Sequence, residues 1–190
     1  AYDSLRHDAF LQGVHRKRIP RILSAAFLRE NRQKIKFSNE SRISKRSASR
    51  RDPTGAVPGI YLGNLGDLYI KIEDWEQASV NLQQGIELCR GTFPVGAGSF
   101  LCSLGWVQGQ QQNFTEAQFS FLEGELLVKV YPWEHVKFLC KKSKVLSLNQ
   151  DFTNAKGALD EAIEIAEGLN VGKDTEVWEA IESAQAFLKS

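Results

Sequence analysis

An internal repeat constrains the fold of this chain more than any other sequence feature. Three windows align without gaps, residues 62–89, 101–128 and 139–166, and their starts are 39 and 38 residues apart. In each window an aromatic residue is followed by a small residue and then by a large apolar residue. These are Trp75, Ala78, Leu82; Phe114, Ala117, Phe121; and Phe152, Ala155, Leu159. Spacings of three and four place such residues on one helical face.

Each window is predicted to hold two helices joined by a tight turn. A short polar residue precedes the aromatic residue in every copy and is suited to cap the second helix: Asp74, Asn113 and Asp151. The small residues Ala78, Ala117 and Ala155 would be buried where helices cross, because they allow close approach. The sequence therefore predicts an all-α fold of three antiparallel helix pairs.

A last amphipathic stretch follows the third window. Its apolar residues share one helical face, and they are Val177, Trp178, Ile181, Ala184 and Leu188. A stack of repeats needs its final apolar surface covered. We therefore expect a C-terminal capping helix, which completes a repeat domain over residues 57–190.

The first window resembles the tetratricopeptide repeat. The resemblance is carried by Leu65-Gly66, Tyr69, Trp75, Ala78, Leu82 and Gly85. The second copy keeps Leu104-Gly105, whereas the third has Lys142-Ser143 at that place. The longer period is similar to that of the family's longer-helix variants. The resemblance covers about residues 58–168. It implies an α-solenoid whose concave groove, lined by the first helix of each pair, binds a peptide or a partner domain.

The family geometry places six candidate partner-binding residues in that groove: Asp67, Trp106, Gln110, Lys137, Lys141 and Lys144. Cys102 and Cys140 are inward positions by the same geometry. Trp106 would be an aromatic anchor, or it would pack between adjacent helices instead. Lys137, Lys141 and Lys144 form one positive stripe that could receive an acidic peptide or a C-terminal carboxylate. The alternative is a solvated charged face.

Some family members hold the C-terminal carboxylate of heat-shock chaperones in a clamp of lysines and asparagines. Lys137 and Lys141 match one part of that clamp. Gly63 and Asp67 stand where a lysine and an asparagine would be needed, so chaperone co-factor activity is not expected.

Charge divides the chain into two regions. Residues 1–51 hold 14 Lys and Arg against 4 Asp and Glu, while the remainder holds 10 against 19. We interpret residues 1–56 as a basic segment, helical at residues 19–31 and a flexible linker at residues 37–52. Residues 15–51 could contact nucleic-acid phosphates. No aromatic residue interleaves residues 42–51, so docking on the acidic repeats, or disorder, is favoured.

Signals of catalysis are missing from the sequence. It contains no GxxxxGK[ST], HExxH or GxSxG motif, so we expect no enzyme and no cofactor. The histidines are His7, His15 and His135, and they lack the i, i+4 spacing and neighbouring carboxylates of a helical metal site. No metal is therefore predicted.

Three cysteines without a close pair argue against a disulfide framework, and they favour a reducing, cytoplasmic compartment. No apolar run approaches the length of about 20 residues needed to cross a bilayer, and no secretory signal is visible. We expect a cytoplasmic protein-interaction module, with nucleic-acid association as the second hypothesis.

Overall fold

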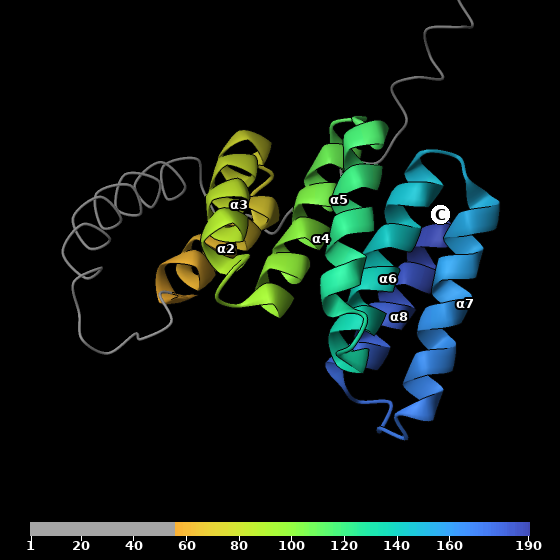
Figure 1. Cartoon of the computed structure of the whole chain (residues 1–190). Helices are drawn as coiled ribbons and strands as arrows, with labels where there is room; N and C mark the ends of the chain where they lie inside the picture. The colour runs from red at the N-terminus through yellow and green to blue at the C-terminus, as the bar shows by residue number, and fades with distance from the viewer. Residues whose placement is uncertain (1–55) are drawn as a thin grey trace, which may run out of the picture. The chain divides into compact units, whose positions relative to one another are not determined.

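The computed structural model describes residues 56–190, and in this range it contains seven α-helices and no strand (Figure 1). The helices are α2 (Ala56–Lys71), α3 (Trp75–Cys89), α4 (Pro94–Gln110), α5 (Phe114–Val128), α6 (Pro132–Leu148), α7 (Phe152–Gly168) and α8 (Glu176–Leu188). This confirms the predicted all-α fold of three helix pairs followed by one further helix. The predicted helix at residues 19–31 and the linker at residues 37–52 lie outside the described residues.

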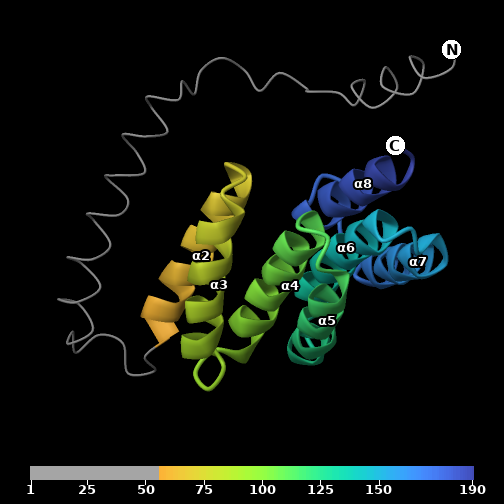
Figure 2. The ribbon, with the colours of Figure 1, turned by 90° about the horizontal axis from the view of Figure 1, so that it is seen from above.

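The helices pack as pairs that succeed one another in chain order (Figure 2). Within each pair the contact is extensive, for α2 with α3, α4 with α5, and α6 with α7. The second and third pairs meet mainly through α4 and α6, and α8 continues this row by packing on α6 and α7. The first pair is joined differently, because it meets the second mainly through α3 and α4.

The turn within each pair has the same backbone conformation. Glu73, Gln112 and Gln150 adopt positive φ angles of 58°, 63° and 60°, one residue before the predicted cap. Asp74 accepts a hydrogen bond from the Gln77 backbone nitrogen at 3.3 Å, and Asp151 accepts one from Asn154 at 3.2 Å. These two predicted caps are confirmed.

The third predicted cap is only partly correct. Asn113 occupies the N-cap position of α5, but its side chain makes no capping hydrogen bond. The predicted side-chain cap is therefore wrong at this position. The helix α5 nevertheless begins at the expected residue, directly after a turn in which Gln112 has a positive φ.

Small residues bring the paired helices into contact. Ala78, Ala117 and Ala155 are each 0% exposed, which confirms the prediction that they are buried. Glycines permit an even closer approach. A Cβ atom built on Gly85 would lie 2.7 Å from the backbone nitrogen of Gly63 on the facing helix.

Enlarging one of these alanines tests the packing. Ala117→Leu is expected to lower the free energy of unfolding by about 1–3 kcal/mol, because the added atoms have no space in a filled interior. The same substitution at the exposed Ala186 should change it by less than about 0.5 kcal/mol. Urea denaturation followed by circular dichroism measures both. Equal effects at the two positions would show that Ala117 is not at a tight crossing.

The end of the array is closed as expected. Val177, Ile181 and Ala184 of α8 are buried against α6 and α7 in a cluster that includes Leu139 and Ala162. Trp178 and Leu188 pack on the same cluster while partly exposed.

In the described part of the chain, none of the helices has the length and apolar character required to pass through a membrane.

Candidate functional site

The three lysines of the predicted stripe lie on α6, between α4 and α8. Lys137 Nζ is 2.7 Å from Glu134 Oε1, one turn earlier on α6, and 3.9 Å from Glu176 Oε2 at the start of α8. Ser99 of α4 donates to the other oxygen of Glu134 at 3.1 Å. Lys137 is therefore neutralised by carboxylates at one end of the stripe.

Lys141 and Lys144 have a different environment. Lys141 Nζ donates to Ser103 Oγ of α4, and Lys144 Nζ donates to Ser183 Oγ of α8, both at 2.9 Å. Within residues 56–190, no carboxylate oxygen pairs with either ammonium group. Burial lowers the pKa of Lys144, and the nearby charge of Lys141 lowers it further, although Cys140 acts in the opposite direction. Within residues 56–190, the hydrogen-bond acceptors of these two partly buried cations are serine hydroxyl groups.

An aromatic pair adjoins the stripe at Lys144. The partly buried ring of Trp106 meets Phe187 of α8 edge-on, with centroids 6.0 Å apart and planes at 70°. Lys144 Nζ lies 6.0 Å from the centroid of the Phe187 ring, within reach of a cation–π attraction. Side chains of α4 and α8 thus meet beside α6. We call the surface made by Trp106, Lys141, Lys144, Ser183 and Phe187 the lysine face.

The other two predicted residues, Asp67 and Gln110, come from α2 and from the end of α4. Asp67 is partly buried on α2, and its charge acts on the thiol of Cys102, as does the opposite charge of Lys141. Gln110 is the last residue of α4 and is partly exposed. In the described range, no hydrogen bond or ion pair joins Asp67 or Gln110 to the three lysines.

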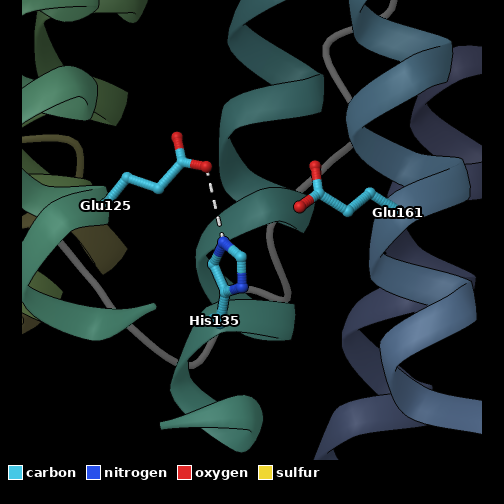
Figure 3. A group of neighbouring side chains, drawn as sticks. All are labelled: Glu125, His135 and Glu161. Atoms are coloured by element: carbon cyan, nitrogen blue, oxygen red, sulfur yellow. Dashed lines mark hydrogen bonds and ion pairs between the residues drawn. The ribbon is translucent and has the colours of Figure 1, made fainter. Parts of the chain in front are cut away.

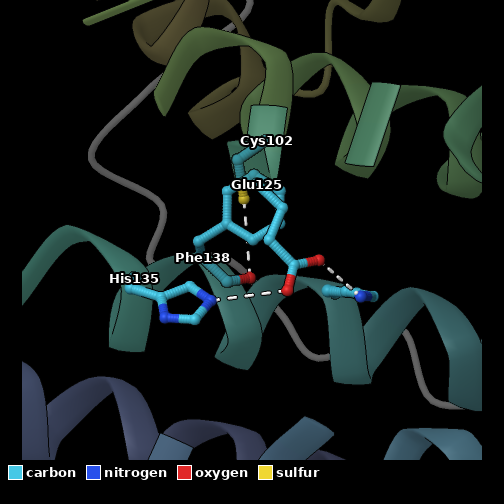
Figure 4. A network of polar contacts seen from close by, with 5 residues as sticks. Cys102, Glu125, His135 and Phe138 are labelled. Carbon is cyan, nitrogen blue, oxygen red and sulfur yellow. Dashed lines mark hydrogen bonds and ion pairs between the residues drawn. The ribbon is translucent and has the colours of Figure 1, made fainter. Parts of the chain in front are cut away.

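The two inward cysteines belong to the interior. Cys102 and Cys140 are 3% and 2% exposed. They therefore cannot line a binding surface. Cys102 Sγ instead lies 3.6 Å from the Phe138 carbonyl oxygen, a contact between α4 and α6 (Figure 4).

A second polar cluster, absent from the sequence predictions, lies where α5, α6 and α7 meet. Glu125, His135 and Glu161 come from these three helices and turn toward one another (Figure 3). One nitrogen or oxygen atom of each side chain lies within 4.8 Å of the corresponding atoms of the other two. His135 is 3% exposed, and its Nε2 is 3.4 Å from Glu125 Oε1. Glu161 is exposed at the surface.

Glu125 is held from two sides. Its second oxygen, Oε2, accepts a hydrogen bond from Lys142 Nζ at 2.7 Å, while Oε1 faces His135 (Figure 4). Burial raises the pKa of Glu125, but Lys142 and His135 outweigh burial and bring the pKa below its usual 4.5. Glu125 is therefore a carboxylate with a fixed orientation.

The position of the α5–α6 turn could have revealed this pair. Glu125 and His135 are equally distant in sequence from Val130, which lies in the turn between two antiparallel helices. Residues placed symmetrically about such a turn lie side by side. Along α6 itself, no carboxylate lies three or four residues from His135, so the spacing within one helix gives no sign of this pair.

The outer surface of α5 also carries an exposed apolar stripe. Phe119, Leu122 and Leu126 are 67%, 67% and 73% exposed, and their spacing by three and four places them on one side of the helix. Val130, in the turn that follows α5, is 75% exposed. The second helix of the middle pair is thus apolar toward solvent as well as toward the core.

Comparison with known proteins adds no assignment: no protein-family model matches the chain, and no curated protein or solved structure is detectably similar to it.

Proposed function

We propose that the chain is a protein-interaction module that binds an acidic segment of a partner protein at the lysine face. The observation that carries this proposal is the pairing of Lys141 and Lys144 with serine hydroxyls. Each ammonium group now donates to a neutral hydroxyl oxygen, and a carboxylate ligand would offer the same donor a negatively charged acceptor and so add a direct Coulomb attraction. The face therefore favours an anionic ligand over a neutral one.

The surroundings narrow the chemistry of the segment. Trp106 and Phe187 supply apolar surface beside Lys144, whereas Glu134 and Glu176 surround Lys137. A segment with a carboxylate next to an apolar side chain could bind Lys144 through the carboxylate and pack its apolar side chain on Trp106 and Phe187. Further carboxylates toward Lys137 would be repelled by the two glutamates. This arrangement gives selectivity for a short acidic motif rather than for a long polyanion.

The sequence resemblance to tetratricopeptide repeats supports the same proposal, since that family binds peptides through the first helices of its pairs. We propose binding rather than catalysis as the activity.

The three cysteines are free and buried, as suits a reducing compartment. We therefore propose that the protein is located in the cytoplasm.

Neutralising the two lysines tests the proposal. Lys141→Gln combined with Lys144→Gln is expected to weaken binding of the captured partner at least tenfold, about 1.4 kcal/mol, because the charge-assisted contacts are lost. Partners captured by the full wild-type chain are identified by mass spectrometry, and their affinities for both proteins are then measured at low and physiological salt. Wild-type binding should also weaken as salt increases.

A matched control removes two positive charges from another part of the surface. Lys129 lies at the end of α5 and Lys156 lies on α7, and both are exposed. Replacing both by Gln should leave the affinity for the partner unchanged. If the lysine-face variant retains wild-type affinity at low salt, the lysine face is not the binding surface. Salt-sensitive binding to generic DNA or RNA by both variants would favour the second hypothesis, through residues 15–51.

A further inference from the structure

We propose that Glu125, His135 and Glu161 form a binding site for one zinc ion that fastens α5, α6 and α7 together. The donor set consists of one imidazole nitrogen and two carboxylate oxygens. Imidazole suits zinc and other late transition metals, whereas magnesium and calcium prefer oxygen ligands alone. Each of the three helices supplies one ligand (Figure 3).

The distances fit this ion. Zinc bonds to histidine nitrogen and carboxylate oxygen measure about 2.0–2.2 Å, so tetrahedral ligands lie about 3.4 Å from one another. His135 Nε2 and Glu125 Oε1 are already separated by 3.4 Å, which exceeds the usual length of a direct hydrogen bond. The exposed Glu161, within 4.8 Å of both, can close the remaining gap by side-chain rotation.

Charge and burial favour a cation at this point. Glu125 and Glu161 bring two negative charges to this point, and Lys142 offsets one of them, so a cation bound between the carboxylates would meet a net negative charge. Lys142 contacts only Oε2 of Glu125 in this cluster. It therefore orients the carboxylate, as outer-shell partners of metal ligands do, and leaves Oε1 facing His135.

The position of the site implies a structural role. Glu125 belongs to the second helix pair, whereas His135 and Glu161 belong to the third. A bound ion would therefore link the two pairs. His135 is nearly buried while Glu161 lies at the surface, so an ion can enter from solvent on the side of α7, and water can complete the coordination.

Calorimetric titration of the full chain with zinc chloride tests this inference. The wild-type chain should show one saturable site that disappears in His135→Gln and weakens at least tenfold in Glu161→Gln. Glu164→Gln, on the same helix and also exposed, is the matched control and should bind as the wild type does. At the same zinc concentration, the melting temperature should rise equally in the wild type and in the control, and it should rise less in Glu161→Gln.

Glu161→Gln keeps the test decisive if the buried His135→Gln variant does not fold, because residue 161 is exposed. His7 and His15 lie outside the described residues, and any zinc that they bind would be the same in all the variants. Absence of saturable binding, or equal affinity in Glu161→Gln and Glu164→Gln, would overturn the proposed site. These measurements are independent of partner binding at the lysine face.

Discussion

Gly85→Ala is expected to lower the free energy of unfolding by about 1–3 kcal/mol, even though alanine is the better helix former. The new Cβ atom would lie 2.7 Å from the Gly63 nitrogen and 2.9 Å from the Gly59 oxygen. Both are backbone atoms of α2, so no side-chain rotation can relieve the contact. The first two helices would have to separate, and they would lose packing along their length.

Gly157→Ala is the matched substitution with the opposite expected sign. Gly157 lies inside α7, and a Cβ atom there would have no neighbour within 4 Å. Alanine should therefore stabilise the protein by about 0.5–1 kcal/mol through the smaller entropy lost on folding. Urea unfolding of the two variants gives both values. Shifts of the same sign would contradict the packing of α2 against α3.

The three cysteines are expected to resist alkylation in the folded protein. Burial raises the pKa of Cys102 and of Cys140 to about 12, and burial also raises that of Cys89. A free thiol has a pKa of about 8.5, and only the thiolate reacts. At pH 8, iodoacetamide should therefore modify Cys102 and Cys140 at least about 100-fold more slowly in the native chain than in urea.

Mass spectrometry of peptides taken at successive times follows each thiol separately. Rapid native-state modification of Cys102 or Cys140 would contradict their burial.

The raised pKa values of these thiols also determine how the stability of the fold depends on pH. A group whose pKa is higher in the folded state contributes stability below its unfolded pKa and loses it as pH rises. These two thiols should therefore destabilise the fold progressively from about pH 9 toward pH 12.

Much of the fold could be predicted because the repeat combines several local signals. At Asp74 and Asp151 the cap, the aromatic residue and the small residue all mark the same helix start, and the structure places α3 and α7 there. Asn113 shows the limit of this reasoning. A residue of the capping type can occupy the N-cap position and still not form the capping hydrogen bond.

The candidate site was less predictable, since its contacts join distant parts of the chain. Helical spacing places Lys141 and Lys144 on one side of α6, but their partners Ser103 and Ser183 are contributed by α4 and α8. The contact of Trp106 with Phe187 depends in the same way on how α8 packs. Sequence periodicity describes one helix at a time, so it cannot identify these neighbours.

The contact between the first and second helix pairs differs from the contact between the second and third, and this difference affects how the protein can bend. The first pair meets the second mainly through α3 and α4, while α4, α6 and α8 form one row. A rotation of α2 and α3 about the α3–α4 contact would move Asp67 relative to helices α4 to α8. It would leave every contact within the lysine face unchanged. A comparable rotation at either later joint would separate Lys141 from Ser103 or Lys144 from Ser183. Bending at the first joint is thus decoupled from the geometry of the lysine face.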